Sequence, residues 1–449
     1  METKAYKNSI TEGVIWKQLL AFFFPLLFGT FFQQLYNTVD AVVVGQYVGK
    51  EALAAVGGAA AMIINIFVGF FVGISAGATV TISQFFGGGR FKEVKEAIHT
   101  AVAFSLAAGL LIMIVGLLFA PQILTGMDTP ADTMDDSVLY LRIYFCGMIA
   151  NLLYNMGAGI LRAMGDSKRP LYFLIVSCIV NVALDVFLVV VLNMGVAGVA
   201  VATIISQIVS ALLVWITLMK LPEGYRLQIK AIRIHSWVFK RIVAIGLPAG
   251  FQSLMYSLSN ALIQVSVNSF GTDTVAAWTA YGKIDSLFWM VVNACGISIT
   301  TFVGQNYGAG QYKRVRKGVR QSLLLTAAFT LLINALIIPF GQILFRLFTT
   351  DTAVMEIGLS MLYFLAPLYM TYICIEIYSG ALRGMGDSLL PMLITCGGIC
   401  GIRVVWLLLA VPKWHTMETV MMSYPITWII TSLLFLIYYR KYTQKNHIV

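Results

Sequence analysis

The chain has 449 residues, of which 59% are hydrophobic and only 11% are charged, and its net charge is +10. A soluble protein needs roughly a quarter charged residues to cover its surface, so this composition excludes a soluble domain. Apolar runs recur along the whole chain, which indicates a membrane protein with many spans.

Twelve apolar runs are each long enough to cross a hydrocarbon core of about 30 Å. An open sheet cannot satisfy its backbone in lipid, and the alternation typical of a membrane β-barrel is absent. The sequence therefore predicts an all-α integral membrane protein with twelve transmembrane helices. We expect them at residues 16–44, 52–86, 95–120, 137–161, 170–192, 195–219, 238–268, 275–306, 318–345, 353–382, 391–411 and 416–439. The first run lacks a cleavage site and is too long for a signal peptide, so we expect a retained span.

Basic residues lie mostly on alternate loops, whereas the other loops carry an acidic stretch at residues 128–136. By the positive-inside rule, the basic loops and both termini face the cytoplasm. We therefore expect a multi-pass protein of the bacterial cytoplasmic (inner) membrane, with no nucleic-acid partner. The basic side includes Lys4, Lys7, Arg90, Lys92, Lys95, the segment 220–241, Lys313, Arg314, Arg316, Lys317, Arg320 and the tail from Arg440.

The chain contains the same short motif twice, LRAMGDS at 161–167 and LRGMGDS at 382–388, and each copy is followed by a proline at the same distance. This repetition predicts two related six-helix bundles in residues 1–219 and 238–449, joined by a cytoplasmic linker at 220–237. Six spans per repeat make the repeats parallel, related by a pseudo-twofold axis along the membrane normal, as in many transporters. We interpret both motifs as tight structural turns, ended by glycine, with the arginine at the lipid headgroups.

Proline and glycine residues mark two further structural features. Pro25 and Pro248 fall inside the first and seventh spans, where each removes a backbone hydrogen bond, and we expect them to act as hinges. Glycines at four-residue spacing predict close helix packing. They are Gly69, Gly73 and Gly77 in the second span, and Gly397 and Gly401 in the eleventh.

Polar side chains inside the spans of the first repeat predict a binding site, because buried ionisable residues are costly and usually functional. Helical spacing places a set on one face of the first span: Gln33, Tyr36, Asn37 and Asp40. The same rule places Asn181 and Asp185 on one face of the fifth span. We expect Gln33, Tyr36 and Asn37 to line a substrate cavity.

Two carboxylates, two amides and a hydroxyl suit a hard cation, which prefers oxygen ligands. They equally suit a proton, because two carboxylates in a low dielectric share one. We predict cation or proton coupling at Asp40, Asn155, Asn181, Asp185 and Thr203, with Na⁺ as a candidate ion at all of these except Asn155. The alternative is a polar network that only fixes helix packing.

The second repeat departs from this pattern, with Ile263 and Trp406 where the first has Asp40 and Asp185. Its charged residues inside spans include Glu376 and Arg403, which we expect either to form a structural ion pair or to contact substrate. The cavity residues expected in this half are Tyr256, Asn260, Gln264, Glu376 and Arg403.

The whole chain resembles the multidrug and toxic compound extrusion (MATE) transporters. The resemblance rests on Pro25 with the segment 36–40, on Val303-Gly304-Gln305-Asn306-Tyr307-Gly308-Ala309-Gly310, and on both LR(A/G)MGDS turns. It implies two six-helix bundles that exchange drug export for inward Na⁺ or H⁺. Asp40, Asn181, Asp185 and Thr203 are similar to the cation site of the DinF-like branch. The NorM-like branch carries acids in the seventh and tenth spans; the seventh has none here, and Glu376 leaves a second site open.

The sequence therefore predicts a monomeric secondary antiporter that exports amphipathic, often cationic, organic compounds by alternating access. The alternative is a lipid-linked saccharide flippase of the same superfamily, which would be expected to show more intramembrane arginines. We expect no enzymatic activity, because neither metal-ligand spacing nor a nucleophile motif is present. We also expect no cofactor apart from the coupling ion, and drug-like small molecules and the bilayer as partners.

Overall fold

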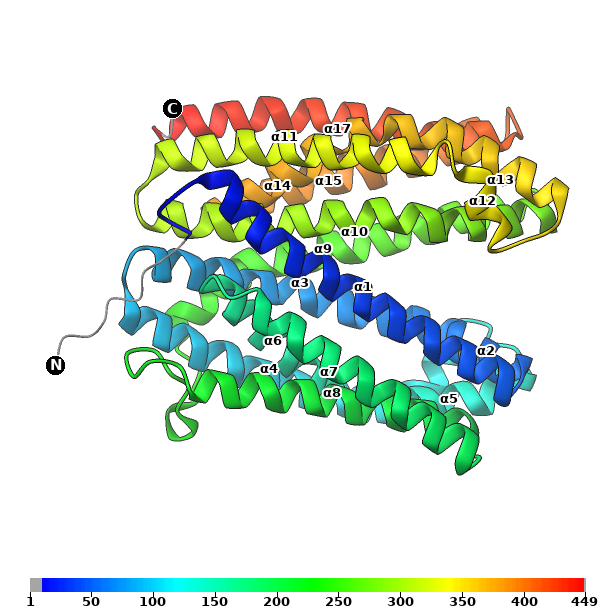
Figure 1. Ribbon diagram of the computed structural model, residues 1–449, viewed down its shortest axis with the longest axis horizontal. Coiled ribbons are helices and arrows are strands. Elements are labelled where there is room, and N and C mark those ends of the chain that lie inside the picture. Colours follow the sequence, from blue (N-terminus) through cyan, green and yellow to red (C-terminus); the bar gives the residue numbers. More distant parts are fainter. Residues whose placement is uncertain (1–9, 448–449) are drawn as a thin grey trace. The chain divides into compact units, whose positions relative to one another are not determined.

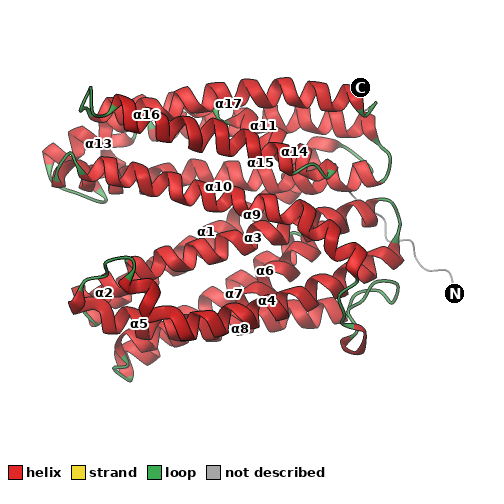
Figure 2. Ribbon diagram, turned by 180° about the vertical axis from the view of Figure 1, so that it is seen from behind, coloured by secondary structure: helices red, strands yellow, loops and turns green. Residues whose placement is uncertain are grey.

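The computed structural model describes residues 10–447, and every regular element among them is helical (Figures 1 and 2). The basic residues Lys4 and Lys7 lie outside this part of the chain. Two compact units are present, one of residues 24–250 and the other of residues 1–23 and 251–449. Helices α1 (Ile15–Tyr47) and α9 (Ser236–Asn268) each contribute to both units, because the division falls inside them.

The unit of residues 24–250 consists of antiparallel helices packed around two apolar cores. In addition to most of α1 and the start of α9, its elements are α2 (Lys50–Gly57), α3 (Ala59–Gly87), α4 (Phe91–Thr125), α5 (Ala131–Cys146), α6 (Met148–Ala163), α7 (Lys168–Asp185), the π-helical segment η1 (Val186–Val191), α8 (Gly195–Met219) and the 3₁₀ turn η2 (Ile229–Ala231).

The other unit contains the remainder of α9 and the C-terminal helices. They are α10 (Thr272–Gly308), α11 (Tyr312–Ile337), α12 (Gly341–Arg346), α13 (Thr352–Leu365), the 3₁₀ segment η3 (Ala366–Thr371), α14 (Ile373–Met385), α15 (Leu389–Thr395), the π-helical segment η4 (Cys396–Gly401), α16 (Ile402–Ala410) and α17 (Met417–Lys445). Helix α14 packs against α10, α11 and α17 and is therefore central to this unit.

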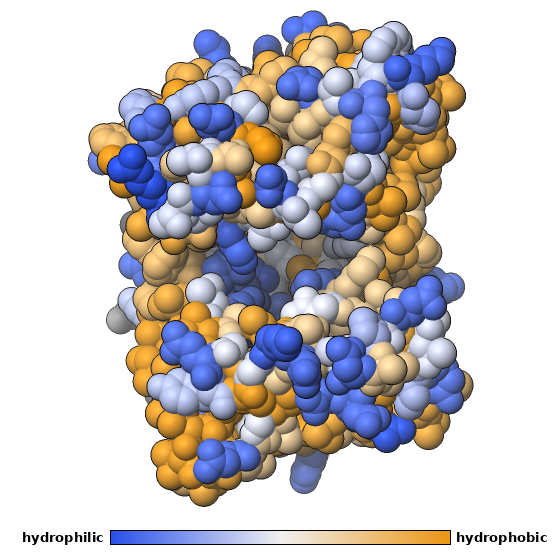
Figure 3. Space-filling view, turned by 90° about the vertical axis from the view of Figure 1, so that its right-hand side faces the viewer, coloured by the Kyte–Doolittle hydropathy of each residue, from blue (hydrophilic) through white to orange (hydrophobic). Residues whose placement is uncertain are grey.

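Eleven helical segments in the described chain are long and apolar enough to cross a membrane, and a bent pair brings the number to twelve. The prediction of a twelve-span helical membrane protein is confirmed. The fourth span differs in detail, since α5 and α6 meet at Gly147 with a bend of 50° instead of forming one straight helix. At the end of each unit seen in Figure 3, hydrophilic side chains cover the helix ends and hydrophobic ones cover the flanks, as expected for helices in lipid.

The two repeated motifs form the expected tight turns. Gly165 and Gly386 have φ values of 93° and 101°, in the left-handed region that favours glycine. The N–H of each following aspartate donates back to the helix, Asp166 to Leu161 O (2.9 Å) and Asp387 to Leu382 O (3.0 Å). This six-to-one hydrogen bond is the Schellman arrangement, which satisfies carbonyls at a helix end.

The expected headgroup position of the motif arginine is wrong for the second copy. The Arg383 guanidinium donates to Gln252 Oε1 (3.2 Å) and lies 3.5 Å from Ser379 Oγ. The side chain therefore points into the unit and ties α14 to α9.

Close glycine packing joins α3 to the first part of α9. A Cβ atom at Gly73 would lie 2.5 Å from the backbone of Gly250, and one at Gly246 would lie 2.5 Å from Ile74 O. The backbones thus touch directly, which confirms the packing predicted for Gly73 and also holds at Gly77. The same prediction is wrong in the eleventh span, because nothing lies within 4 Å of a Cβ at Gly397 and only its own helix approaches Gly401.

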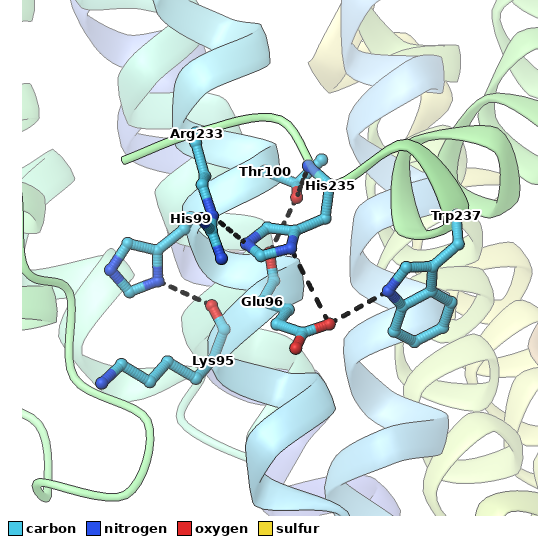
Figure 4. Close-up of polar contacts among 7 residues, drawn as sticks. All are labelled: Lys95, Glu96, His99, Thr100, Arg233, His235 and Trp237. Atoms are coloured by element: carbon cyan, nitrogen blue, oxygen red, sulfur yellow. Dashed lines mark hydrogen bonds and ion pairs between the residues drawn. The ribbon is translucent and has the colours of Figure 1, made fainter. Parts of the chain in front are cut away.

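The connection between α8 and α9 is bound to the start of α4. Two hydrogen bonds hold it, Gln228 N–H to His99 Nε2 (3.0 Å) and His235 N–H to Thr100 Oγ1 (3.1 Å). At the start of α9, Trp237 Nε1–H donates to Glu96 Oε2 (3.0 Å), and Figure 4 shows this bond and that of His235. Tyr225 and Leu227 of the same connection are buried in the apolar core beside α4. This polar segment is therefore an ordered part of its unit.

Replacing Gly246 by leucine is expected to lower the thermal unfolding midpoint of the purified protein. The new side chain would meet the α3 backbone, and overpacking of this kind costs about 1–3 kcal/mol. Gly282→Ala is the control, because no atom lies within 4 Å of a Cβ there. Equal midpoints for Gly246→Leu and the control would show that the α3–α9 contact is not close.

Candidate functional site

Three polar side chains from two helices surround Asp40 of α1 in the unit of residues 24–250. Asn181 and Asp185 of α7 and Thr203 of α8 lie near its carboxyl group and are its polar side-chain neighbours. Asp40 is 8% exposed and Asp185 is 0% exposed. The structure thus places four of the five residues predicted to form the coupling site next to one another.

Several polar side-chain atoms in this cluster have no hydrogen-bond partner within residues 10–447. Among the described residues, Asp40 Oδ1, both side-chain atoms of Asn181 and both carboxylate oxygens of Asp185 are buried and lack a hydrogen-bond partner of regular geometry. Thr203 donates its hydroxyl proton to Val199 O (3.0 Å), so its oxygen keeps lone pairs free to accept. Buried acceptors without donors are costly. The donor set therefore fits an oxygen-preferring cation or a shared proton.

A π-helical segment follows directly after Asp185. Helix α7 ends at this residue, and η1 continues the span from Val186 to Val191. Segments of this kind are rare and often occur at functional sites. The other π-helical segment, η4, ends two residues before Arg403. In both units, therefore, the irregular part of the span lies beside its ionisable residue.

Aromatic and amide side chains that were not predicted complete the surroundings of Asp40. Tyr140 and Tyr144 of α5 are electrostatic neighbours of Asp40, as is Tyr36 of its own helix. The Tyr144 hydroxyl accepts a hydrogen bond from Gln207 Nε2 of α8 (3.2 Å). The spacing of four between Tyr140 and Tyr144, and between Thr203 and Gln207, is the only signal in the sequence that suggests these residues.

The remaining residues predicted in the first repeat lie elsewhere. The Asn155 amide donates to Asn151 O (2.9 Å) and Asn151 Oδ1 (3.1 Å), and Asn155 is not among the polar side-chain neighbours of Asp40. Gln33 and Asn37 are exposed on α1. They remain predicted cavity residues.

In the other unit, Glu376 of α14 lies in a polar and aromatic environment. Tyr372 donates a hydrogen bond to Glu376 Oε2 (3.3 Å), and the Tyr372 hydroxyl lies 3.3 Å from that of Tyr256. Gly296 of α10 leaves the space that the carboxyl group occupies. The charged neighbour of Glu376 is Arg383 of the repeated motif.

Arg403 does not form the ion pair with Glu376 that the sequence left open. Within residues 10–447, the structure contains no ion pair of either residue. Arg403 instead approaches Ser259 Oγ (3.4 Å) and lies 4.4 Å from the centre of the Tyr424 ring. A cation over an aromatic face is stabilised by the ring quadrupole, which explains how this buried charge is accommodated.

Two other residues of the second repeat occupy the places of the acids. Ile263 is buried in an apolar cluster, and Trp406 donates to Thr419 O (2.8 Å). Asn260 is exposed, whereas Gln264 donates to Asn268 Oδ1 (2.8 Å).

Asp285 of α10 has more hydrogen bonds than any of the residues predicted in this unit, and sequence analysis did not identify it as a site. Its carboxylate accepts from Tyr281 (3.3 Å), from Trp289 Nε1 (2.7 Å) and from Tyr369. Phe288 stacks on Tyr369 with ring centres 4.0 Å apart. A carboxylate enclosed by aromatic rings has the chemistry that favours organic cations.

The two units thus each contain carboxylates inside their helices, buried at Asp40 and Asp185 and partly buried at Asp285 and Glu376, with different neighbours. No group of three or more His, Cys, Asp or Glu side chains able to hold a metal ion occurs in residues 10–447. Acids inside membrane-spanning helices are typical of ion-coupled transport. The fold and the site together define a multi-pass helical membrane transporter.

Comparison with known proteins gives the family. The family model described as MatE matches residues 25–187 and 248–408, so the chain belongs to this family of multidrug efflux transporters. Members are transporters, and the protein is accordingly a transporter and not an enzyme.

Individual relatives agree with this assignment. The chain is 28% identical over 444 residues to "Probable multidrug resistance protein YoeA" of Bacillus subtilis, covering 97% of this chain and 95% of the relative. It is 26% identical to the "FAD transporter" of Shewanella oneidensis over 78% of each chain. A solved structure described as the outward-facing conformation of a multidrug resistance MATE family transporter matches with a TM-score of 0.90, at 21% identity and over 99% of both chains. This likeness establishes the fold.

Replacing Tyr369 by phenylalanine is expected to destabilise the protein, because it removes one of the three donors to Asp285 and leaves a partly buried carboxylate under-satisfied. The cost should be about 1–3 kcal/mol and should appear as a lower thermal unfolding midpoint. Tyr363→Phe is the matched control, since Tyr363 is 48% exposed. An unchanged midpoint for Tyr369→Phe would contradict the role assigned to this hydrogen bond.

Proposed function

We propose that the protein is a secondary antiporter that exports amphipathic, often cationic, organic compounds in exchange for inward Na⁺ or H⁺. The observation that carries the proposal is the buried pair of carboxylates, Asp40 and Asp185, with acceptor atoms left unsatisfied. Relatives named as a multidrug resistance protein and as a multidrug export protein support an organic substrate. The cluster of Asp40, Asn181, Asp185 and Thr203 also favours placement in the DinF-like branch.

In the proposed cycle, Na⁺ or H⁺ enters from outside and binds between Asp40 and Asp185. It balances one of the two negative charges and so relieves their mutual repulsion, which is strong in a low dielectric. The ion drives transport only if its affinity differs between the outward- and inward-open states. We propose that α1 bends near Pro25, since Asp40 is on the same helix, and that Pro248 has the corresponding role in α9.

The substrate class rests on the aromatic residues of the second unit. Asp285 and Glu376 each accept hydrogen bonds from tyrosines, and flat rings beside a carboxylate suit a cation with an apolar body. The proposed cavity residues are Gln33, Tyr36, Asn37, Tyr256, Asn260, Gln264, Glu376 and Arg403. We further propose a monomer in the bacterial inner membrane with both termini in the cytoplasm.

Neutralising the carboxylate pair should stop coupled export. In proteoliposomes with a Na⁺ or a pH gradient imposed separately, Asp40→Asn and Asp185→Asn should each reduce gradient-driven ethidium efflux at least about tenfold. A tenfold loss of rate corresponds to a rise of about 1.4 kcal/mol in the activation free energy of coupled efflux. Asn also mimics a protonated carboxyl, so a proton-driven variant should be held in its ion-bound state.

Asp135→Asn serves as the control, because this acid is exposed near the start of α5. A folded Asp40→Asn protein that still extrudes ethidium against a gradient would contradict the coupling role. If neither a Na⁺ gradient nor a pH gradient drives ethidium efflux by the unaltered protein, a flippase for lipid-linked saccharides would be favoured instead.

A further inference from the structure

A cavity of about 1070 Å³ lies at the end of the second unit where α11 begins and α17 ends. The first three turns of α11 form one wall, Tyr439 of α17 and His447 form the other, and Tyr378 of α14 contributes to the floor. Helix α14 packs against both α11 and α17. All of these residues belong to one unit.

The cavity is strongly basic. Its described lining contains five Lys and Arg residues and no Asp or Glu: Lys313, Arg314, Arg316, Lys317 and Arg320. Arg314 is already engaged, since it donates to Gly13 O (2.8 Å) and Glu12 O (2.9 Å). The other four form no ion pair with any described residue. Uncompensated positive charge of this kind attracts an anion.

Below the basic rim, the cavity is apolar and aromatic. Val319 and Leu323 line it, and the rings of Tyr378 and Tyr439 lie 4.7 Å apart at its floor. The Tyr439 hydroxyl is buried and has no hydrogen-bond partner among the described residues. The site therefore offers positive charge, a free hydroxyl and an apolar surface to a single ligand.

The position of the cavity in the repeat is also informative. Helix α11 corresponds to α4 in the repeated sequence, and the space beside α4 is filled by Tyr225 and Leu227 of the α8–α9 connection. Beside α11, His447 is the only described residue beyond α17 that reaches the cavity. Within residues 10–447, therefore, no segment fills the space beside α11 in the way that Tyr225 and Leu227 fill the space beside α4.

Both walls are the ends of membrane-spanning helices, so the cavity lies at the level of the lipid headgroups. Basic pockets between helices at this level bind anionic headgroups, and tyrosines are enriched there. A free phosphate would satisfy the charge but leave the apolar floor uncovered. The floor suits the glycerol and first acyl carbons of a lipid.

We propose that this cavity binds an anionic phospholipid, with its phosphate among Arg316, Lys317 and Arg320. The Tyr439 hydroxyl donates a further hydrogen bond to the headgroup, and the lipid backbone covers Val319 and Leu323. The bound lipid would fill the space between α11 and α17.

The test compares ligands on the purified, delipidated full-length protein at low ionic strength. Dihexanoyl phosphatidylglycerol should bind and raise the unfolding midpoint, whereas dihexanoyl phosphatidylcholine and inorganic phosphate should have much weaker effects. The triple variant Arg316→Gln/Lys317→Gln/Arg320→Gln should bind phosphatidylglycerol about 100-fold more weakly, since each basic residue near an anionic lipid contributes about fivefold (about 1 kcal/mol). Higher salt should weaken binding to the unaltered protein.

The triple variant Lys92→Gln/Lys220→Gln/Lys240→Gln is the control, because it removes the same charge from exposed positions outside the cavity. Tyr439→Phe removes a single oxygen and should weaken binding of phosphatidylglycerol about threefold. This variant still tests the site if the triple variant of the cavity fails to fold. Equal binding of the two lipids, or an equal loss in the control, would overturn the site. Inorganic phosphate binding as tightly as phosphatidylglycerol would show an anion site and overturn the lipid assignment.

Discussion

Two carboxylic acids, Asp40 of α1 and Asp185 of α7, lie together inside a unit made of membrane-spanning helices, and the proposed coupling depends on how their charge is balanced. In a low dielectric, two like charges at close range are tolerated only with a proton or a cation between them. Asn181 and Thr203 add oxygens but no charge. Ion binding between these two acids, as we propose, makes the energy of this unit depend on the ion, which is the requirement for coupling an ion gradient to a conformational change.

The two repeats share the same turns but differ in the side chains inside their helices. Both copies of the LR(A/G)MGDS motif end a helix in the same left-handed glycine turn. Elsewhere in the second copy, Ile263 and Trp406 stand in place of the acid pair, while Asp285 and Glu376 accept hydrogen bonds from tyrosines. The proposed antiport accordingly uses the buried, unsatisfied acceptor atoms of one unit for the ion and the aromatic environment of the other for the substrate.

The second copy also differs at the membrane surface. The connection after α8 fills the space beside α4 and is held by backbone hydrogen bonds to His99 and Thr100. The matching space beside α11 is a basic cavity with a tyrosine floor. Polar groups at a helix end need partners. In the first unit the α8–α9 connection supplies them, and in the second we propose that an anionic lipid headgroup does so.

The sequence by itself determined the spans, the two glycine turns and the polar faces of single helices, because hydrophobic length and helical periodicity are local properties. It therefore placed Asp40 on one face and Asn181 with Asp185 on another. Only the tertiary structure decided which faces meet. It brought Tyr140 and Tyr144 beside Asp40, enclosed Asp285 in aromatic rings and turned Arg383 inward. These contacts depend on bends, π-helical segments and close backbone packing between helices distant in sequence, and no local pattern encodes them.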